Sequence, residues 1–182
     1  MVIMEGFGRG LVLEPFFGTV VLGANLILQA GNEAQKEDLL PKLAEGGLKL
    51  AFAYAERQAR FDLHDVETKG EKSGDGYTIN GAKGVVFGAA SADKIIVAAR
   101  TSGDSRDTEG ITLFLVDSDA SGVSRRDYTT NDALRASEIS FENVQVGASA
   151  VLGDVDGGHA VIERVAEFAV AALCAEAVGC MD

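Results

Sequence analysis

The chain has 182 residues, of which 47% are hydrophobic and 24% charged, and this composition is typical of a globular protein with a core. Its net charge of −12 would repel the phosphate backbone of DNA or RNA, and no basic patch opposes that field. We therefore expect no nucleic-acid partner. The most apolar stretch, Leu11 to Leu28, contains Glu14 and Pro15, so it predicts a buried helix and no membrane span.

Helical spacing dominates the first part of the chain, from about Glu5 to Gly46. Apolar residues recur there every three or four positions, which predicts two helices. Gly31 and Asn32 mark the break between them, because glycine ends helices and asparagine caps the next one. The glycines between Gly6 and Gly10 follow no predicted strand, so they do not indicate a phosphate-binding turn.

Between about Leu48 and Gly153 the hydrophobic period changes to two. Asp75-Gly76 separates alternating segments and predicts a β-hairpin, and Asn80-Gly81 predicts a second turn. Several short strands with frequent turns are typical of an antiparallel β-barrel or sandwich. The expected strands cover residues 83–87, 94–101, 111–116, 123–126 and 137–144.

The last part of the chain, residues 154–182, predicts one amphipathic helix rich in alanine. Helices at the two flanks cannot cover their own apolar faces, so we expect a longer protein or an assembly to complete them. Cys174 and Cys180 fit small apolar residues on this helix, and a reduced, cytoplasmic setting follows. No cysteine or histidine spacing indicates a metal site.

Single polar residues give few candidates for chemistry. Glu56 follows the apolar run from Leu48 to Tyr54, where a carboxylate marks either a structural hydrogen bond or the edge of a site; we favour the structural role. His64 and His159 each stand alone and are interpreted as surface or loop residues rather than catalysts.

Segments along nearly the whole chain resemble one enzyme family in the same order. Residues 43–56 resemble the junction between N-terminal helices and barrel in the acyl-CoA dehydrogenases. Gly74-Asp75-Gly76-Tyr77-Thr78-Ile79-Asn80-Gly81-Ala82-Lys83 is similar to that family's Gly-Asp-Gly-Tyr-x-Leu-Asn-Gly-x-Lys segment. Members of the pimeloyl-CoA dehydrogenase small-subunit type are the most similar. Further matches lie at residues 92–101, 134–137, 141–146 and 152–153.

The resemblance implies an α+β fold in which an antiparallel β-barrel is flanked by α-helices. Residues 1–47 would be the end of an N-terminal helical domain, and residues 48–153 the barrel middle domain. Residues 154–182 would be the first helix of a truncated C-terminal helical domain. A fragment of this kind would be inactive alone.

The resemblance also implies flavin adenine dinucleotide (FAD) as cofactor, lying against two strands of the barrel. An oxidised flavin ring needs an apolar face and hydrogen bonds at its edge, and backbone amides supply such bonds whatever the side chain. Phe61 and Glu167 would lie near the acyl-CoA substrate. The implied flavin-binding residues are Phe52, Tyr54, Ala55, Val85, Val86 and Phe87.

Several of these positions depart from the family pattern. Ala55 replaces a threonine, Val85 replaces an aromatic residue, and Phe87 replaces a threonine or serine. The arginine expected near coenzyme A is replaced by Val170. The family's catalytic glutamate would lie beyond Asp182, so no residue of this chain receives a catalytic role.

The function implied is a flavin-dependent acyl-CoA dehydrogenase, which introduces an α,β double bond into an acyl-CoA thioester. The implied partners are the acyl-CoA, further subunits in a homo- or hetero-oligomer, and an electron-transfer flavoprotein. Two alternatives stay open: a non-catalytic partner subunit of a heteromeric dehydrogenase, and a stand-alone β-barrel binding module.

Overall fold

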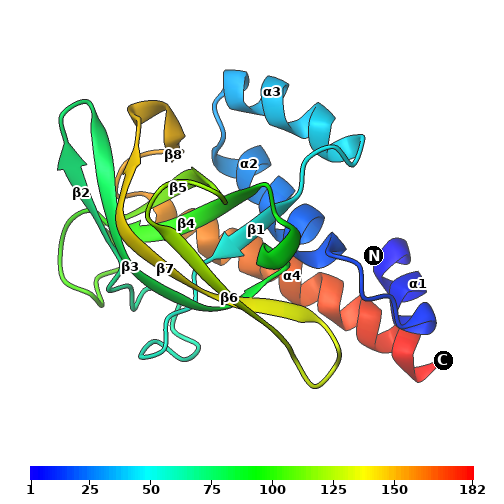
Figure 1. The fold of residues 1–182 in the computed structure, drawn as a ribbon. Coiled ribbons are helices and arrows are strands. Elements are labelled where there is room, and N and C mark those ends of the chain that lie inside the picture. Colours follow the sequence, from blue (N-terminus) through cyan, green and yellow to red (C-terminus); the bar gives the residue numbers. More distant parts are fainter.

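The computed structural model describes all 182 residues and shows helices, then strands, then one long helix (Figure 1). The side chain of Asn32 accepts a hydrogen bond from the Gln35 amide at 2.9 Å and so caps the helix that follows it, as expected. Two helices were expected before residue 46, but the structure has four helical segments there. The helices are α1 (Val2–Gly10), the π-helical η1 (Phe17–Ala24), α2 (Asn25–Ala30), α3 (Glu33–Ala44) and α4 (Gly158–Met181).

Eight strands form one sheet in the order β6-β7-β3-β2-β4-β5-β8, with β1 paired to β4 outside this path. The predicted α+β class is confirmed, and the expected strand segments all lie in the sheet. The strands are β1 (Leu50–Ala53), β2 (Lys69–Ser73), β3 (Gly76–Phe87), β4 (Lys94–Arg100), β5 (Ile111–Asp117), β6 (Val123–Thr129), β7 (Arg135–Val146) and β8 (Val151–Leu152).

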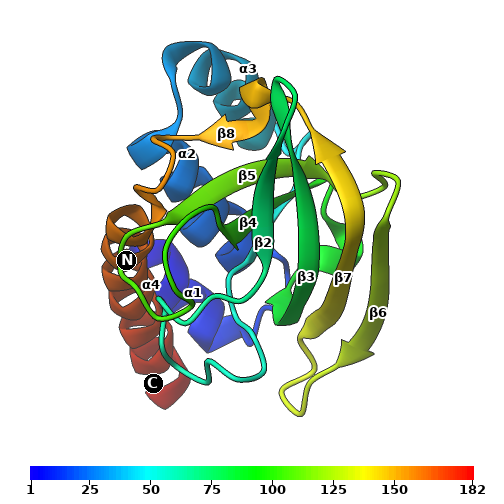
Figure 2. The same ribbon diagram turned by 90° about the vertical axis from the view of Figure 1, so that its left-hand side faces the viewer.

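The prediction of a closed antiparallel barrel was wrong, because the sheet is mixed and open. Strand β1 pairs with β4 in parallel, and the path ends at β6 and β8. Both edges are poor partners for further strands. Strand β8 has only two residues, and β6 carries Arg125, Arg126 and Asp127, which are charges of the kind that protect an edge. Figure 2 shows β6 at the outer edge of the curved sheet.

The predicted hairpin between β2 and β3 is confirmed, although its loop lies one residue earlier than the predicted Asp75-Gly76 turn. Ser73 pairs with Gly76, which leaves Gly74 and Asp75 as the two-residue loop. Gly74 adopts φ 58°, a left-handed conformation that costs glycine little.

The predicted turn at Asn80-Gly81 was wrong, because β3 runs through both residues. The register with β7 shifts there, which is the mark of a β-bulge. Asn80 still acts like a turn residue: its side-chain oxygen accepts the Asn143 amide at 2.7 Å. Gly81 leaves no room for a side chain, since a Cβ there would lie 2.7 Å from the Cα of Thr68.

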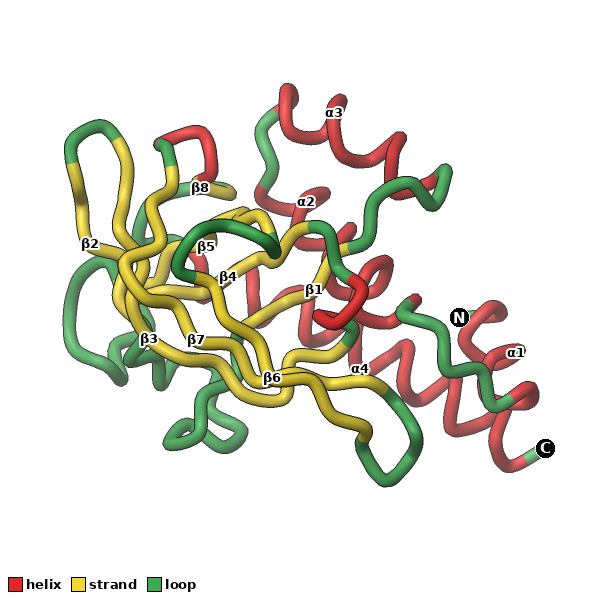
Figure 3. Tube along the Cα trace, in the orientation of Figure 1, coloured by secondary structure: helices red, strands yellow, loops and turns green.

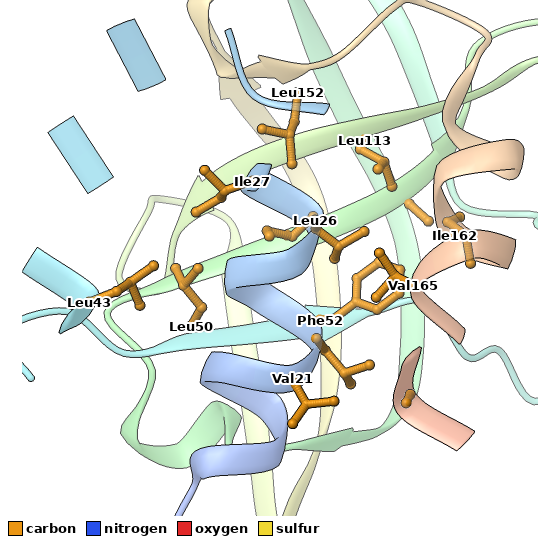
Figure 4. Packing of buried hydrophobic residues seen from close by; sticks show 14 of the residues in the cluster. Val21, Leu26, Ile27, Leu43, Leu50, Phe52, Leu113, Leu152, Ile162 and Val165 are labelled. Atoms are coloured by element: carbon orange, nitrogen blue, oxygen red, sulfur yellow. The ribbon is translucent and has the colours of Figure 1, made fainter. Parts of the chain in front are cut away.

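Two apolar cores lie on opposite faces of the sheet, and β1 contributes to both. Leu50 and Phe52 pack with η1, α2 and α4 on the helical side (Figure 4). Ala51 and Ala53 pack on the other face with residues such as Phe114. Successive side chains of a strand point to opposite faces, so a strand buried on both sides is apolar throughout.

Helices α1 and α4 cross in close contact at the end of the molecule where both termini lie (Figure 1). Gly8 and Gly179 make this approach possible: a Cβ on either would lie 2.0 Å from a carbonyl oxygen of the other helix. Cys174 and Cys180 lie on α4 as expected, but both are exposed and unpaired rather than buried. None of the helices combines the length and apolarity needed to cross a membrane.

Candidate functional site

Two segments that are about 30 positions apart in sequence meet at one side of the sheet. One is the start of the long loop from β1 to β2, drawn without helix or strand in Figure 3, and the other is the end of β3. The amide of Gly84 donates a hydrogen bond of 2.9 Å to the carbonyl of Ala55. The structure therefore brings the two flavin-binding segments implied by the sequence, residues 52–56 and 85–87, side by side.

A buried ion pair lies directly beneath this junction. Lys83 Nζ lies 2.6 Å from Glu56 Oε1, and the two side chains are only 0% and 3% exposed. Lys83 also donates to the carbonyl of Tyr54 at 3.2 Å. The carboxylate of Glu56 accepts backbone N–H groups of Glu67 at 2.8 Å and Thr68 at 3.0 Å. The pair thus connects β3 to both ends of the loop between β1 and β2.

Burial and charge act on this pair in opposite directions. Burial lowers the pKa of Lys83 from its ordinary value to about 8, because the charged form loses its hydration, although Glu56 opposes this shift. Burial alone would raise the pKa of Glu56. The nearby ammonium of Lys83 and hydrogen bonds from Lys83, Gln58 and Glu67 outweigh burial and lower it. We therefore describe the pair as ionised at neutral pH.

The interpretation of Glu56 as a structural hydrogen-bonding residue agrees with these contacts. Sequence reasoning missed the burial of Lys83, although a signal was present. Tyr77, Ile79 and Lys83 occupy alternate positions of β3 and all three are buried. A lysine in phase with buried neighbours predicts an inward-facing charge, which then requires a carboxylate partner.

Free backbone donors and exposed apolar surface occur together at the junction. The amides of Ala55 and Glu56 donate to no other group of the chain. Val85 lies in a bulge of β3 between Lys83 and Val86 and adopts φ 52°. Its side chain is 47% exposed. Tyr54 is half-buried, and burial raises the pKa of its phenol. Uncommitted N–H groups beside apolar side chains fit what a flavin ring requires.

The other predicted site residues divide into buried and exposed groups. Phe52 and Val86 are buried in the two cores, and the ring of Phe52 stacks on that of Tyr54 at 5.0 Å. Their side chains are therefore not available to a ligand. Phe61 is 97% exposed in the loop after β1, and Glu167 is exposed on α4.

A cavity of about 290 Å³ opens beside the end of β3. Phe87 and Gly88 form one wall, the segment from Val12 to Gly18 forms another, and Leu173 of α4 contributes to the lining. Its mixture of apolar walls with a few polar groups is typical of small-molecule sites. Of the predicted flavin-binding residues, Phe87 is the one that lines it.

A second buried cation, Arg100, holds loop backbone. Its guanidinium donates to five backbone carbonyls, including those of His64 at 2.8 Å and Glu109 at 2.6 Å. Arg100 therefore fastens the loop after β1 to the loop between β4 and β5, and none of its five bonds goes to the 54–55 peptide.

The sequence of this chain matches the family model for the acyl-CoA dehydrogenase middle domain over residues 51–144, just over half of its length. The chain belongs to the acyl-CoA dehydrogenase family. This confirms the family inferred from the motifs, whereas the finer likeness to pimeloyl-CoA dehydrogenase small subunits stays a prediction.

Similar proteins extend the match over most of the chain. A 3-(aryl)acrylate reductase of Clostridium sporogenes is 36% identical over 87% of this chain and 42% of its own length. A probable medium-chain specific acyl-CoA dehydrogenase of Caenorhabditis briggsae is 34% identical over 84% of this chain and 40% of its own length. The butyryl-CoA dehydrogenase structure from Megasphaera elsdenii superimposes with a TM-score of 0.88 at 31% identity, covering 97% of this chain and 47% of that one. The chain thus spans less than half the length of these relatives.

Proposed function

We propose that the protein carrying this chain is an FAD-dependent acyl-CoA dehydrogenase that forms an α,β double bond in an acyl-CoA thioester. The observation that carries the proposal is the junction of residues 54–56 with β3, where two uncommitted amides lie beside the exposed Val85 and the half-buried Tyr54. Family membership supports the same chemistry. Bound FAD would supply the acceptor for the hydride.

The chain's own contribution is to bind and orient the flavin ring. The amides of Ala55 and Glu56 would donate to its edge, while Tyr54 and Val85 would contact its face. These groups exclude water from one side of the ring, which strengthens the hydrogen bonds at its edge. Ala55 offers no hydroxyl, so the backbone alone would supply the polar contacts at this position. The catalytic base would lie outside residues 1–182.

The substrate and domain assignments are extensions of this proposal. The acyl-CoA would pass near Phe61 and Glu167, the two exposed side chains that the resemblance implies. Residues 1–47 would end an N-terminal helical domain, residues 48–153 would form the middle domain, and α4 would begin a C-terminal helical domain. Further subunits would complete the oligomer, and an electron-transfer flavoprotein would accept the electrons of the reduced flavin.

The test is reconstitution of the whole protein with FAD. We expect tight binding of added FAD, an absorbance band at about 450 nm, and bleaching of that band when an acyl-CoA is added without an electron acceptor. A folded whole protein that stays colourless after incubation with FAD would refute the proposal.

One observation favours a second candidate, a non-catalytic partner subunit of a heteromeric dehydrogenase. Ala55, Val85 and Phe87 together remove two hydroxyls and an aromatic ring from the implied flavin site. A partner subunit predicts that the protein purifies with a related chain and that only their complex is active. Activity of a pure homo-oligomer would contradict it.

A further inference from the structure

The Glu56–Lys83 pair has a contact that the proposed function does not use: the bond from Lys83 to the carbonyl of Tyr54. Lys83 Nζ donates 2.6 Å to the carboxylate and 3.2 Å to this carbonyl. Glu56 also accepts three bonds from elsewhere, so its role in joining the loop to the sheet is accounted for. The contact that depends on Lys83 alone is the one to Tyr54.

The Tyr54 carbonyl fixes the direction of the next amide. The chain contains no cis peptide, and in a trans peptide the C=O and the N–H point in opposite directions. With its carbonyl held by Lys83, the peptide between Tyr54 and Ala55 must aim the Ala55 N–H away from the buried ammonium. That N–H is one of the two uncommitted donors of the site.

The next peptide plane is held by the same strand. Gly84, the neighbour of Lys83, donates its amide to the carbonyl of Ala55 at 2.9 Å. Both peptides that flank Ala55 are therefore anchored to consecutive residues of β3. A loop residue fixed on both sides keeps its donor in one direction before any ligand arrives, which lowers the entropic cost of binding.

A buried lysine is a costly way to join two segments. Removing an ammonium from water is unfavourable even beside a carboxylate, and apolar side chains often replace such pairs without loss of stability. A methionine at position 83 could fill the same space but could not donate to the Tyr54 carbonyl. Packing alone thus does not account for the choice of residue.

We propose that Lys83, itself held by Glu56, is a positioning residue that aims the Ala55 N–H at the edge of the flavin ring. The inference rests on the proposed flavin function and adds to it the group that orients the backbone donor. An N–H donor to the N1–C2=O edge of a flavin stabilises the reduced ring, which carries its extra negative charge there, more than the oxidised form. Loss of its orientation therefore makes the flavin harder to reduce.

The experiment compares four forms of the whole protein reconstituted with FAD: wild type, Lys83→Met, Glu56→Gln/Lys83→Met and Arg100→Met. The double variant removes both charges, so it leaves no unpaired buried carboxylate and folds even where the single variant does not. Arg100→Met is the matched control, because it also deletes a buried cation bonded to carbonyls but leaves the 54–55 peptide intact. For each form the FAD dissociation constant, the midpoint potential of the bound flavin and the melting temperature are measured.

We expect FAD to bind roughly tenfold more weakly to both Lys83 variants, as the loss of about one well-aligned hydrogen bond implies. Their flavin potential becomes more negative, while Arg100→Met lowers the melting temperature without moving the potential. A wild-type potential in the double variant overturns the inference, and so does an equal shift in Arg100→Met. Failure of the wild type to bind FAD instead refutes the proposed function, so the two failures are distinguishable.

Discussion

Substituting Gly8 by alanine is expected to separate α1 from α4. A Cβ at Gly8 would lie 2.0 Å from the carbonyl oxygen of Glu176 and 2.9 Å from the amide nitrogen of Cys180. Both are backbone atoms of a long helix and cannot rotate away. The helices must move apart, which loosens the packing of Met4, a residue only 4% exposed.

The matched control is Gly6→Ala in the same helix, because a Cβ at Gly6 meets nothing within 4 Å. Both substitutions gain the same helix propensity, about 0.5–1 kcal/mol relative to glycine. This gain cancels in the comparison, so the difference in free energy of unfolding isolates the steric cost. Overpacking costs about 1–3 kcal/mol, and contact with backbone atoms places Gly8→Ala at the upper end.

Urea unfolding of the whole protein, followed by circular dichroism, measures both variants. We expect Gly6→Ala to be slightly more stable than wild type and Gly8→Ala to be less stable by about 2 kcal/mol, the steric cost less the gain in helix propensity. Equal effects of the two substitutions would refute the reasoning, since the close crossing of α1 and α4 would then not exist.

Two further predictions concern the buried charges. Glu56→Gln is expected to cost about 3 kcal/mol at pH 7, because Lys83 loses its counter-ion and must either remain charged in an apolar site or give up its proton. The folded-state pKa of Glu56 is lowered, so the carboxylate stabilises the fold above its unfolded pKa of about 4.3 and loses this effect as the pH falls through the folded value. The difference between wild type and Glu56→Gln in the free energy of unfolding, measured with urea, should therefore become smaller as the pH falls below about 4. A difference that does not change with pH would contradict this prediction. Arg100→Met is expected to cost about 2–4 kcal/mol and to make residues 102–110 sensitive to limited proteolysis, because their carbonyls lose the guanidinium; unchanged cleavage would contradict this role.

Local sequence patterns were sufficient to predict many of the strands, the start of α3 and the family. The alternation from residue 83 onward located the strands, because a half-buried strand has a period of two whatever surrounds it. Asn32 predicted the start of α3, since capping depends on the first helical turn alone. The ordered motifs indicated the family and implied that residues near 54 and 86 meet.

Features that depend on pairing between distant segments needed the tertiary structure. Asn80-Gly81 carries the signal of a turn, yet β3 continues through it and pairs with β7 on both sides, with the extra residue of the bulge in β7. The open sheet ends at the charged strand β6 and at the two-residue strand β8, and the strand period does not show which strands lie at the edges.

In the candidate site, too, some features follow from the sequence and others only from the tertiary structure. The sequence by itself determined that Glu56 follows an apolar run, whereas our reading of it missed that Lys83 is buried. Only the tertiary structure placed one beside the other and aimed the lysine at the Tyr54 carbonyl. The physical reason is that a buried charge is tolerated only with a specific partner, and which partner comes within reach is decided by long-range strand packing rather than by neighbours in sequence.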